Sequence, residues 1–369
     1  MTTRKTTTKA GKSSRGVLRL AALTQQSSQP NSAHSCDHAP SPRLQTRYPY
    51  SVATSATTDH VLAPARPHTL LADYATLFKV RISTMVIITA GAGFYLGSLQ
   101  SGISPFHAGL LQALIGITIV TCGSSALNQA LERKTDRLMR RTADRPMAAG
   151  RISLTHGLVL GFAATFLGSA YLAYTTNLLT GTLTLLTAIG YVAIYTPLKR
   201  VTTINTFIGA FPGALPPLIG WTAARGIIEW PGVALFAILF VWQFPHFMAI
   251  GWMYREDYTR GGIRLTPNLP NTQYAALSTV VQALFYAAIM IPVSLWPAML
   301  HVTGSAYAVI ATILGLGYLW STIRFARIVR DPDSDASRCA ARNLLHASII
   351  YLPLLLAAMM LDAKGRLFF

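Results

Sequence analysis

The chain has 369 residues and a formal net charge of +18, yet only 12% of its residues are charged while 51% are hydrophobic, and its mean hydropathy is +0.40. This composition excludes an ordinary soluble enzyme and predicts an all-α protein that crosses a membrane several times. The high net charge does not indicate nucleic-acid binding, because no helix-turn-helix or base-stacking pattern accompanies it.

Residues 1–70 differ in kind from the rest of the chain. They are rich in Ser and Thr, carry nine basic and two acidic residues, and contain no apolar stretch long enough to span a bilayer. Around residues 12–21, basic side chains share one helical face and apolar side chains the other, which is typical of a mitochondrial transit peptide. We therefore expect a transit peptide and a disordered segment over 1–70 and a membrane domain over 71–369. An ordinary disordered tail is the alternative.

Nine apolar runs of about 20 residues follow, each long enough to cross a bilayer as a helix. They cover residues 82–100, 108–131, 154–175, 178–198, 204–223, 232–253, 274–299, 304–323 and 342–361. Lys and Arg fall in alternate connecting loops, as the positive-inside rule predicts. Basic residues crowd 132–153 and 255–264, whereas 101–107 and 300–303 have no Asp, Glu, Lys or Arg. The basic loops are therefore expected on the cytoplasmic or matrix side.

The second apolar run ends in a densely charged stretch, NQALERKTDRLMRRTADRP at residues 128–146. Asn128, Glu132 and Asp136 are spaced by four, so in a helix they point to one side over about 12 Å of its axis. A solvated helix end whose acids pair with neighbouring arginines is the plain interpretation. Acids at a membrane boundary also suggest function, because they are costly there unless they pair or coordinate something.

A second charged stretch, WQFPHFMAIGWMYREDYTRGGIRL at residues 242–265, closes the sixth run. Both stretches follow an even-numbered span, so they emerge on the same side of the membrane. Their carboxylates, which include Glu256 and Asp257, suit Mg²⁺ shared with phosphate oxygens. Lys and Arg side chains suit the phosphates themselves. The candidates for diphosphate binding are Arg141, Arg145, Lys199, Arg200, Arg255 and Arg260.

This combination predicts a lipid diphosphate substrate held by metal and arginines above an apolar cavity. A carrier is the alternative, because FPGALPPLIG at 211–220 and Pro245 are typical of the broken helices that carriers use near a binding site.

The motifs resemble those of the UbiA-type intramembrane prenyltransferases and, within that family, the branch that farnesylates protohaem IX. The resemblance covers nearly all of residues 71–362. It rests on NQALERKTD with MRRTADRPM, on YTPLKRVTTINTFIGAFPGALPPLIGW at 195–221, on WQFPHF, on YREDYTRGG and on ARNLLHASIIYLPLL at 341–355. A family member that prenylates an aromatic quinone precursor would explain the first acidic motif but not WQFPHF or YREDYTRGG.

The resemblance implies a bundle of nine helices around a central cavity, with the acidic motifs beneath loops on the matrix side. Together with the transit peptide, it predicts the mitochondrial inner membrane as the location. It implies that farnesyl diphosphate ionises, that a vinyl group of protohaem IX (haem b) attacks the farnesyl cation, and that water captures the haem cation to give haem O. Membrane lipid and a downstream haem A synthase are the further partners that it implies, and a homo-oligomer is left open.

Carried over to this sequence, the metal ligands are Asn128, Glu132 and Asp136, which act in catalysis together with Asp257. Positions 253 and 261, four residues on either side of Asp257, are Met and Gly, so no second carboxylate stands at this spacing to share a metal with Asp257. Positioning of an arginine is therefore the alternative role for Asp257.

The haem substrate draws attention to two histidines, His246 in WQFPHF and His346 near the start of the ninth run. A haem contact is expected for both, and a hydrogen-bonded packing role is the alternative for each.

Overall fold

The computed structural model describes residues 69–364, which all lie in the second of the two units into which the chain divides, residues 59–369. Residues 1–68, on which almost all of the predicted transit peptide falls, lie outside the described residues. The described part is helical, with a single isolated β-bridge between Thr303 and Ala363.

Nine helices of the described part are long and apolar enough to cross a membrane, which confirms the predicted number and class of elements. They are α3 (Val80–Gln100), α4 (Ala108–Asp136), α6 (Leu154–Thr175), α7 (Leu178–Ile189) with its continuation through the π-helical η1 (Gly190–Tyr195) into α8 (Thr196–Leu198), α9 (Asn205–Arg225), α10 (Trp230–Met253), α12 (Thr272–Met299), α13 (Ser305–Phe325) with the 3₁₀ turn η3 (Ala326–Val329), and α14 (Asp335–Leu361). The short elements are α2 (Leu70–Leu77), α5 (Pro146–Ala149), α11 (Arg255–Arg260) and η2 (Thr266–Asn268).

Two helices extend beyond the apolar runs that predicted them. Helix α4 continues to Asp136 through a charged turn, and α14 already begins at Asp335. The side chain of Ser334 caps α14 by accepting a hydrogen bond from the backbone N–H of Ser337. Hydropathy alone could not find these ends, because their residues are polar although they favour a helix.

The prolines do not break the helices that contain them, so the expectation of broken helices is wrong. Helix α9 is continuous through Pro212, Pro216 and Pro217, and α10 is continuous through Pro245. Prolines are tolerated inside membrane helices because neighbouring groups satisfy the freed backbone carbonyls. The side chain of Gln243 donates to the backbone oxygens of Ala210 and Leu239 and so links α10 to α9 near these prolines.

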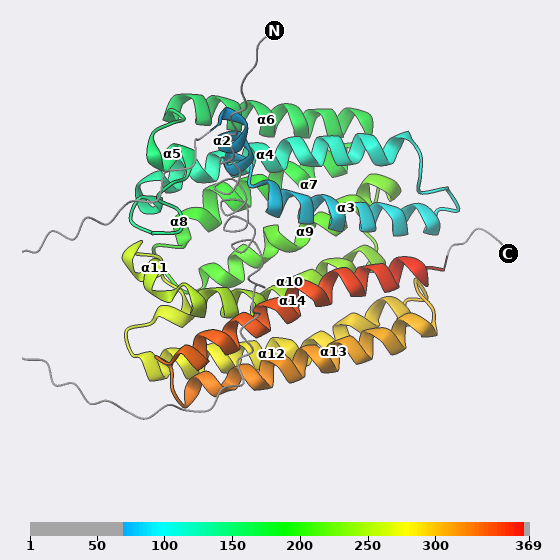
Figure 1. Ribbon diagram of the computed structural model, residues 1–369. Helices are drawn as coiled ribbons and strands as arrows, with labels where there is room; N and C mark the ends of the chain where they lie inside the picture. The colour runs from blue at the N-terminus through cyan, green and yellow to red at the C-terminus, as the bar shows by residue number, and fades with distance from the viewer. Residues whose placement is uncertain (1–68, 365–369) are drawn as a thin grey trace, which may run out of the picture. The chain divides into compact units, whose positions relative to one another are not determined.

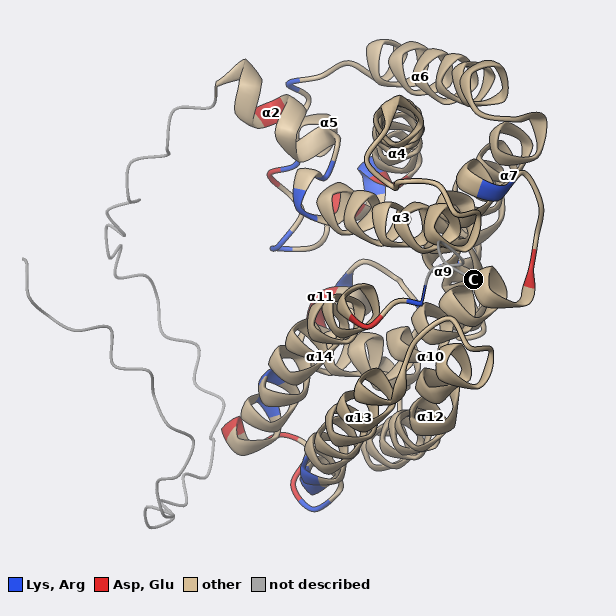
Figure 2. Cartoon of the chain, turned by 90° about the vertical axis from the view of Figure 1, so that its right-hand side faces the viewer, with Lys and Arg blue, Asp and Glu red and all other residues tan. Residues whose placement is uncertain are grey.

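The long helices form two groups that run side by side (Figures 1 and 2). In one group α4 packs against α6 and α3 against α9; in the other α10 packs against α12 and α14, and α12 against α13. Helices α9 and α10 join the groups. A Cβ atom on Gly93 would lie 1.9 Å from Pro217 O, and one on Gly220 would lie 1.8 Å from Ala90 O, so α3 and α9 meet backbone to backbone.

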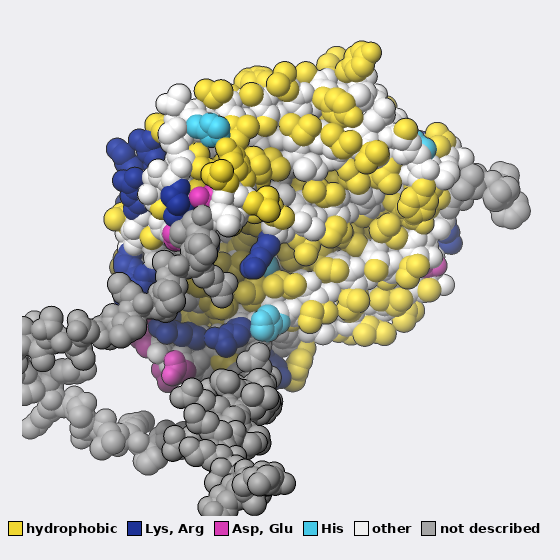
Figure 3. Space-filling view, turned by 45° about the horizontal axis from the view of Figure 1, so that its top comes forward, with side chains coloured by type: hydrophobic (Ala, Val, Ile, Leu, Met, Phe, Trp, Pro, Cys, Tyr) yellow, Lys and Arg dark blue, Asp and Glu magenta, His cyan; other side chains and the backbone are white. Residues whose placement is uncertain are grey.

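On the face that Figure 3 shows, apolar side chains cover the long sides of the helices, whereas Lys and Arg gather toward the end that carries α5 and α11 (Figures 1 and 3). Phe162, Phe166 and Leu167 on α6 are all more than half exposed, as expected for side chains that face lipid. The charged ends of α4 and α10 both lie at the basic end, as the loop charges predicted.

Candidate active site

The last turns of α4 present two carboxylates to one pocket at the basic end of the bundle, and the amide of Asn128 lies one turn before them on the same side of the helix. Asn128 is fully buried: its Oδ1 accepts a hydrogen bond from Lys79 Nζ, and its Nδ2 donates to Thr196 Oγ1 at 2.9 Å. Glu132 and Asp136 follow one and two turns later and line the pocket. The common face predicted from the spacing of four therefore exists, and each member already has a polar partner.

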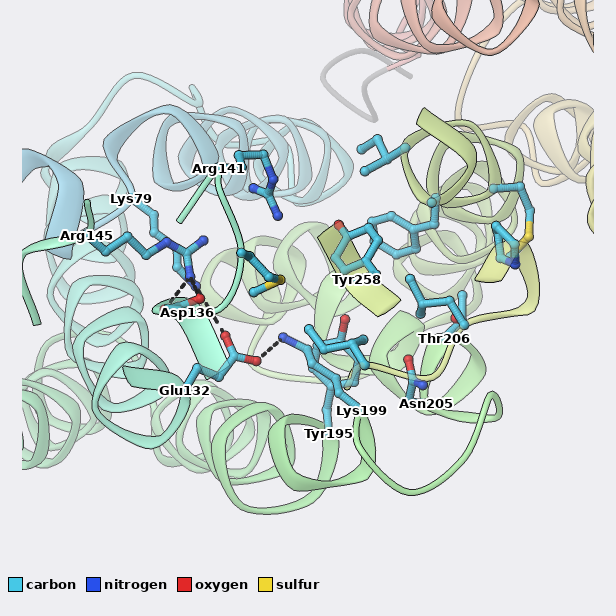
Figure 4. A pocket seen from close by; sticks show the side chains of 18 residues that line it. Lys79, Glu132, Asp136, Arg141, Arg145, Tyr195, Lys199, Asn205, Thr206 and Tyr258 are labelled. Atoms are coloured by element: carbon cyan, nitrogen blue, oxygen red, sulfur yellow. Dashed lines mark hydrogen bonds and ion pairs between the residues drawn. The ribbon is translucent and has the colours of Figure 1, made fainter. Parts of the chain in front are cut away.

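The two carboxylates converge on one arginine (Figure 4). Arg145 Nη1 lies 2.9 Å from both Asp136 oxygens and 3.9 Å from Glu132 Oε2, while Glu132 Oε1 accepts a hydrogen bond from Lys199 Nζ at 2.7 Å. Asp136 is almost completely buried, whereas the side chain of Arg145 keeps about a fifth of its surface exposed. The two acids thus face a common point, bounded by Arg145 and Lys199.

Lys199 reaches this point from the turn after α8. Its Nζ lies 4.5 Å from the ring centroid of Tyr195, the last residue of the π-helical η1. Burial would lower the pKa of Lys199, but Tyr195 and Glu132 outweigh burial and raise it above its ordinary value. Lys199 therefore stays cationic at any physiological pH.

Lys79 is a pocket residue that the sequence analysis missed. It is the residue directly before α3, and its backbone takes a left-handed conformation with φ of 49°, which is uncommon outside glycine. This turn aims Nζ at Asn128 and at the hydroxyl of Tyr191, which it reaches at 3.0 Å. The only signal in the sequence was a lone lysine ahead of the first apolar run.

The pocket combines charge with an apolar wall. Its cationic side chains are Lys79, Arg141, Arg145 and Lys199, and its acids are Glu132 and Asp136. The lining therefore has a surplus of two positive charges, which favours an anionic ligand. Apolar residues from α10 and from the segment after α11 complete it, among them Met248, Ile263 and Leu265.

Asp257 acts on the pocket through Arg141. It accepts hydrogen bonds from the backbone N–H of Arg141, at 3.4 Å, and from the guanidinium of Arg260. Burial would raise the pKa of Asp257, but these donors outweigh burial and lower it below its ordinary value. The Arg141 guanidinium lies over the rings of Tyr254 and Tyr258, at 5.2 and 5.8 Å from their centroids. Of the two roles considered for Asp257, positioning of an arginine agrees better with these contacts.

Three of the six predicted phosphate-binding residues do not line the pocket. Arg200 is exposed beyond α8, and Arg260 is engaged by Asp257. Arg255 turns away: its guanidinium donates to the backbone oxygen of Pro332 at 2.9 Å and to Asp333 at 2.6 Å. Arg255 thus ties α11 to the loop before α14. Glu256, from the same motif, is exposed and pairs with Arg338.

The two candidate haem histidines lie in different surroundings. His246 Nδ1 is 2.7 Å from Ser348 Oγ on α14, and its ring stacks on Trp242 with centroids 4.7 Å apart. Its neighbours Phe247 and Met248 line the pocket, so His246 occupies an adjacent face of α10. His346 is exposed on α14, two residues before Ser348.

The donor set was compared with what a divalent cation requires. The described residues contain no cluster of three or more His, Cys, Asp or Glu side chains that could hold a metal by themselves. They do contain Glu132 and Asp136 facing one point, with the amide of Asn128 a turn away. One or two carboxylates completed by substrate phosphate oxygens is the usual protein environment of Mg²⁺, so these residues fit that ion.

Comparison with known proteins gives a family and a fold. Residues 85–349 match the model of the UbiA prenyltransferase family. A protein of Koribacter versatilis named protoheme IX farnesyltransferase is 45% identical over 303 residues, which are 82% of this chain and 97% of that protein.

Two solved structures share the fold. One, from work on digeranylgeranylglyceryl phosphate synthase, matches with a TM-score of 0.64 and 17% identity, over 80% of this chain and 98% of that one. The other, a UbiA homologue from Archaeoglobus fulgidus bound to DMAPP and Mg²⁺, matches with a TM-score of 0.51 and 16% identity, over 78% of this chain and 99% of that one. At such identities the likeness concerns the fold alone.

Proposed function

The chain belongs to the UbiA prenyltransferase family, and we propose that it transfers the farnesyl group of farnesyl diphosphate to a vinyl group of protohaem IX, giving haem O. The observation that carries this proposal is the pocket at the end of α4, where four cations and two carboxylates meet an apolar wall inside a membrane bundle. The near full-length similarity to a protoheme IX farnesyltransferase selects the acceptor.

In the first step the bond between C1 of farnesyl and the diphosphate oxygen breaks, and the electron pair leaves with the diphosphate. Arg145 and Lys199 stabilise the negative charge that develops on this leaving group, because their cationic ends already lie at the point where the acids converge. Arg141 approaches from the loop after α4, held by Asp257. The apolar wall keeps stray water from the allylic cation.

When bound, Mg²⁺ would act as a Lewis acid and a template for the diphosphate. Glu132 and Asp136 would hold it, with Asn128 as the third donor. In the structure these groups are paired with Lys199, Arg145 and Lys79. The same three cations suit the diphosphate oxygens. When Mg²⁺ and diphosphate bind, the cations would therefore turn to the diphosphate and the acids to Mg²⁺, so that no charge would be left unpaired.

Protohaem IX would lie beside α10, with His246 as its contact. The hydrogen bond to Ser348 and the stacking on Trp242 fix the plane of the imidazole, which leaves Nε2 as the nitrogen for a ligand. After the vinyl group attacks farnesyl C1, the positive charge lies on the side-chain carbon next to the porphyrin. Water adds to that carbon, and its proton leaves with the diphosphate.

The test is mass spectrometry of haem extracted from membranes that contain this chain, supplied with protohaem IX, farnesyl diphosphate and Mg²⁺. The expected product is protohaem plus one farnesyl group and one hydroxyl group. Unmodified protohaem, together with prenylation of an aromatic quinone precursor offered in the same membranes, would overturn the proposal.

The mitochondrial inner membrane is the proposed location, supported by the amphipathic basic segment within residues 12–21. The basic loops that carry the pocket would then face the matrix. A chain that begins near residue 60 should form product when expressed in a bacterium, but should fail to enter mitochondria. Loss of activity in a truncated chain that still inserts into the membrane would contradict this assignment.

A further inference from the structure

Asn205, the first residue of α9, stands out in the wall of the pocket. It is completely buried and lines the pocket together with Lys199 and Tyr195 (Figure 4). Its Nδ2 donates to the backbone oxygens of Thr202 and Arg264, both at 2.5 Å. Its Oδ1 has no hydrogen-bond partner among the described residues.

The two carbonyl partners fix which way the amide points. Rotation of the amide by half a turn would place Oδ1 against two backbone oxygens, so Nδ2 must stay on the side of Thr202 and Arg264. Oδ1 is therefore held on the opposite side, and Figure 4 shows it turned toward the other side chains of the pocket.

A buried acceptor without a partner is unfavourable and needs a reason. The hydrogen bonds of Nδ2 to two carbonyls explain why an NH₂ donor is present at this position, but they do not explain the acceptor oxygen that is buried with it. An acceptor that projects into a pocket is suited to a small donor, and water is the smallest. A carboxylate at this position would instead pair with Lys199 and compete with the diphosphate.

Resting on the function proposed above, we propose that Asn205 Oδ1 holds the water molecule that captures the haem cation. Farnesyl C1 is bonded to the diphosphate, so the vinyl group must enter this same pocket to reach it. After the C–C bond forms, the water oxygen attacks the cationic carbon beside the porphyrin while Asn205 accepts a hydrogen bond from one O–H. The released diphosphate takes the proton. An amide is a poor base, so Asn205 orients the water without removing a proton from the cation.

Without a positioned water, the same cation reacts by a competing route. It loses a proton from the neighbouring CH₂ group to the diphosphate, which gives a farnesylated alkenyl haem lighter than haem O by one water molecule. The two products share the first step and differ only in the second. Their ratio therefore reports on the water and is independent of how fast farnesyl diphosphate ionises.

The experiment compares this product ratio in full-length wild type, Asn205→Leu, Asn205→Gln and Thr206→Val, each given protohaem IX, farnesyl diphosphate and Mg²⁺. Leucine fills the volume of asparagine and offers no acceptor. Glutamine keeps an amide with both its acceptor oxygen and its N–H donors, and Thr206→Val removes the neighbouring hydroxyl of the same wall. We expect Asn205→Leu to lower the ratio of hydroxylated to alkenyl product by about tenfold, as for the loss of one hydrogen bond. The other two variants should keep haem O as the main product.

Two outcomes would overturn the inference. One is haem O as the sole product of Asn205→Leu at any rate of turnover. The other is loss of both products in both Asn205 variants while Thr206→Val stays active, which would assign Asn205 to folding of the α8–α9 turn. Failure of the proposed function is distinct from either, because the wild type would then yield no farnesylated haem at all.

Discussion

The substitution Asp136→Asn tests whether the acidic motif serves Mg²⁺ and diphosphate while a separate residue, His246, contacts protohaem. Asparagine has nearly the same shape as aspartate, so the change removes one negative charge from the point shared with Glu132 and Arg145. If the acids hold Mg²⁺, the lost charge stabilisation is worth several kcal/mol at the leaving group. We expect turnover to fall by a factor on the order of 10² or more, which corresponds to about 2.7 kcal/mol, and the Mg²⁺ requirement to rise.

The same substitution should lower the free energy of unfolding by less than the loss of a fully buried ion pair would. Asp136 is buried, but Arg145 keeps 20% of its side-chain surface exposed and can regain water when its partner is neutralised. The loss should therefore stay below the 3–5 kcal/mol typical of breaking a fully buried ion pair. Protohaem binding should persist, because its expected contact, His246, does not line the pocket that contains Asp136. The His246 ring is held by Ser348 on α14.

The assay combines turnover as a function of Mg²⁺ concentration, farnesyl diphosphate affinity and the absorption spectrum of bound protohaem. Asp144→Asn is the matched control, since Asp144 lies in the loop that follows α4, exposes 72% of its side chain and pairs with Arg151 outside the pocket. It should leave all three readouts near wild type. The reasoning would be refuted if Asp136→Asn lost protohaem but kept its Mg²⁺ response and its diphosphate affinity.

Three further changes probe other parts of the chain. His246→Ala should alter the spectrum of bound protohaem and reduce turnover while leaving farnesyl diphosphate affinity intact; an unchanged spectrum and rate would exclude the haem contact. Gly93→Ala should lower the thermal midpoint by the equivalent of about 1–3 kcal/mol or more, because its Cβ would meet Pro217 O, whereas Gly317→Ala, with open space around it, should be neutral or slightly stabilising. The lowered pKa of Asp257 means that its contribution to stability is complete above about pH 4 and is lost as pH falls through the folded-state pKa. Thermal midpoints should therefore fall more steeply in wild type than in Asp257→Asn below about pH 4, and parallel curves would contradict this.

The fold could be predicted from the sequence because a bilayer imposes one dominant rule. Each span needs about 20 apolar residues, and the loop charges give an independent check on the count. What hydropathy could not supply were features that depend on packing. The continuity of α9 through three prolines is one example, and the backbone contact between Gly93 and Pro217 is another.

The first acidic motif could be predicted because its spacing matches the helical repeat, which places Glu132 and Asp136 on one face whatever surrounds them. The cations could be predicted only as a set. Arg145 and Arg255 look alike in sequence, yet one reaches the acids and the other turns to Asp333, since loop geometry decides where a long side chain ends. Lys79 escaped notice because its role depends on a left-handed turn.

The pairing within the pocket explains how so much charge can be kept at the edge of a membrane. An isolated buried ion is unfavourable, and a buried pair is tolerated only when the geometry is good and remaining hydrogen bonds are satisfied. Glu132 with Lys199 and Asp136 with Arg145 meet that condition in the described residues. A diphosphate offers each cation an oxygen of the same kind that it would give up, and a divalent cation offers the same exchange to each acid. In the function proposed above, the charges would therefore be compensated both before and after binding, and a small difference between the two states would let the product leave.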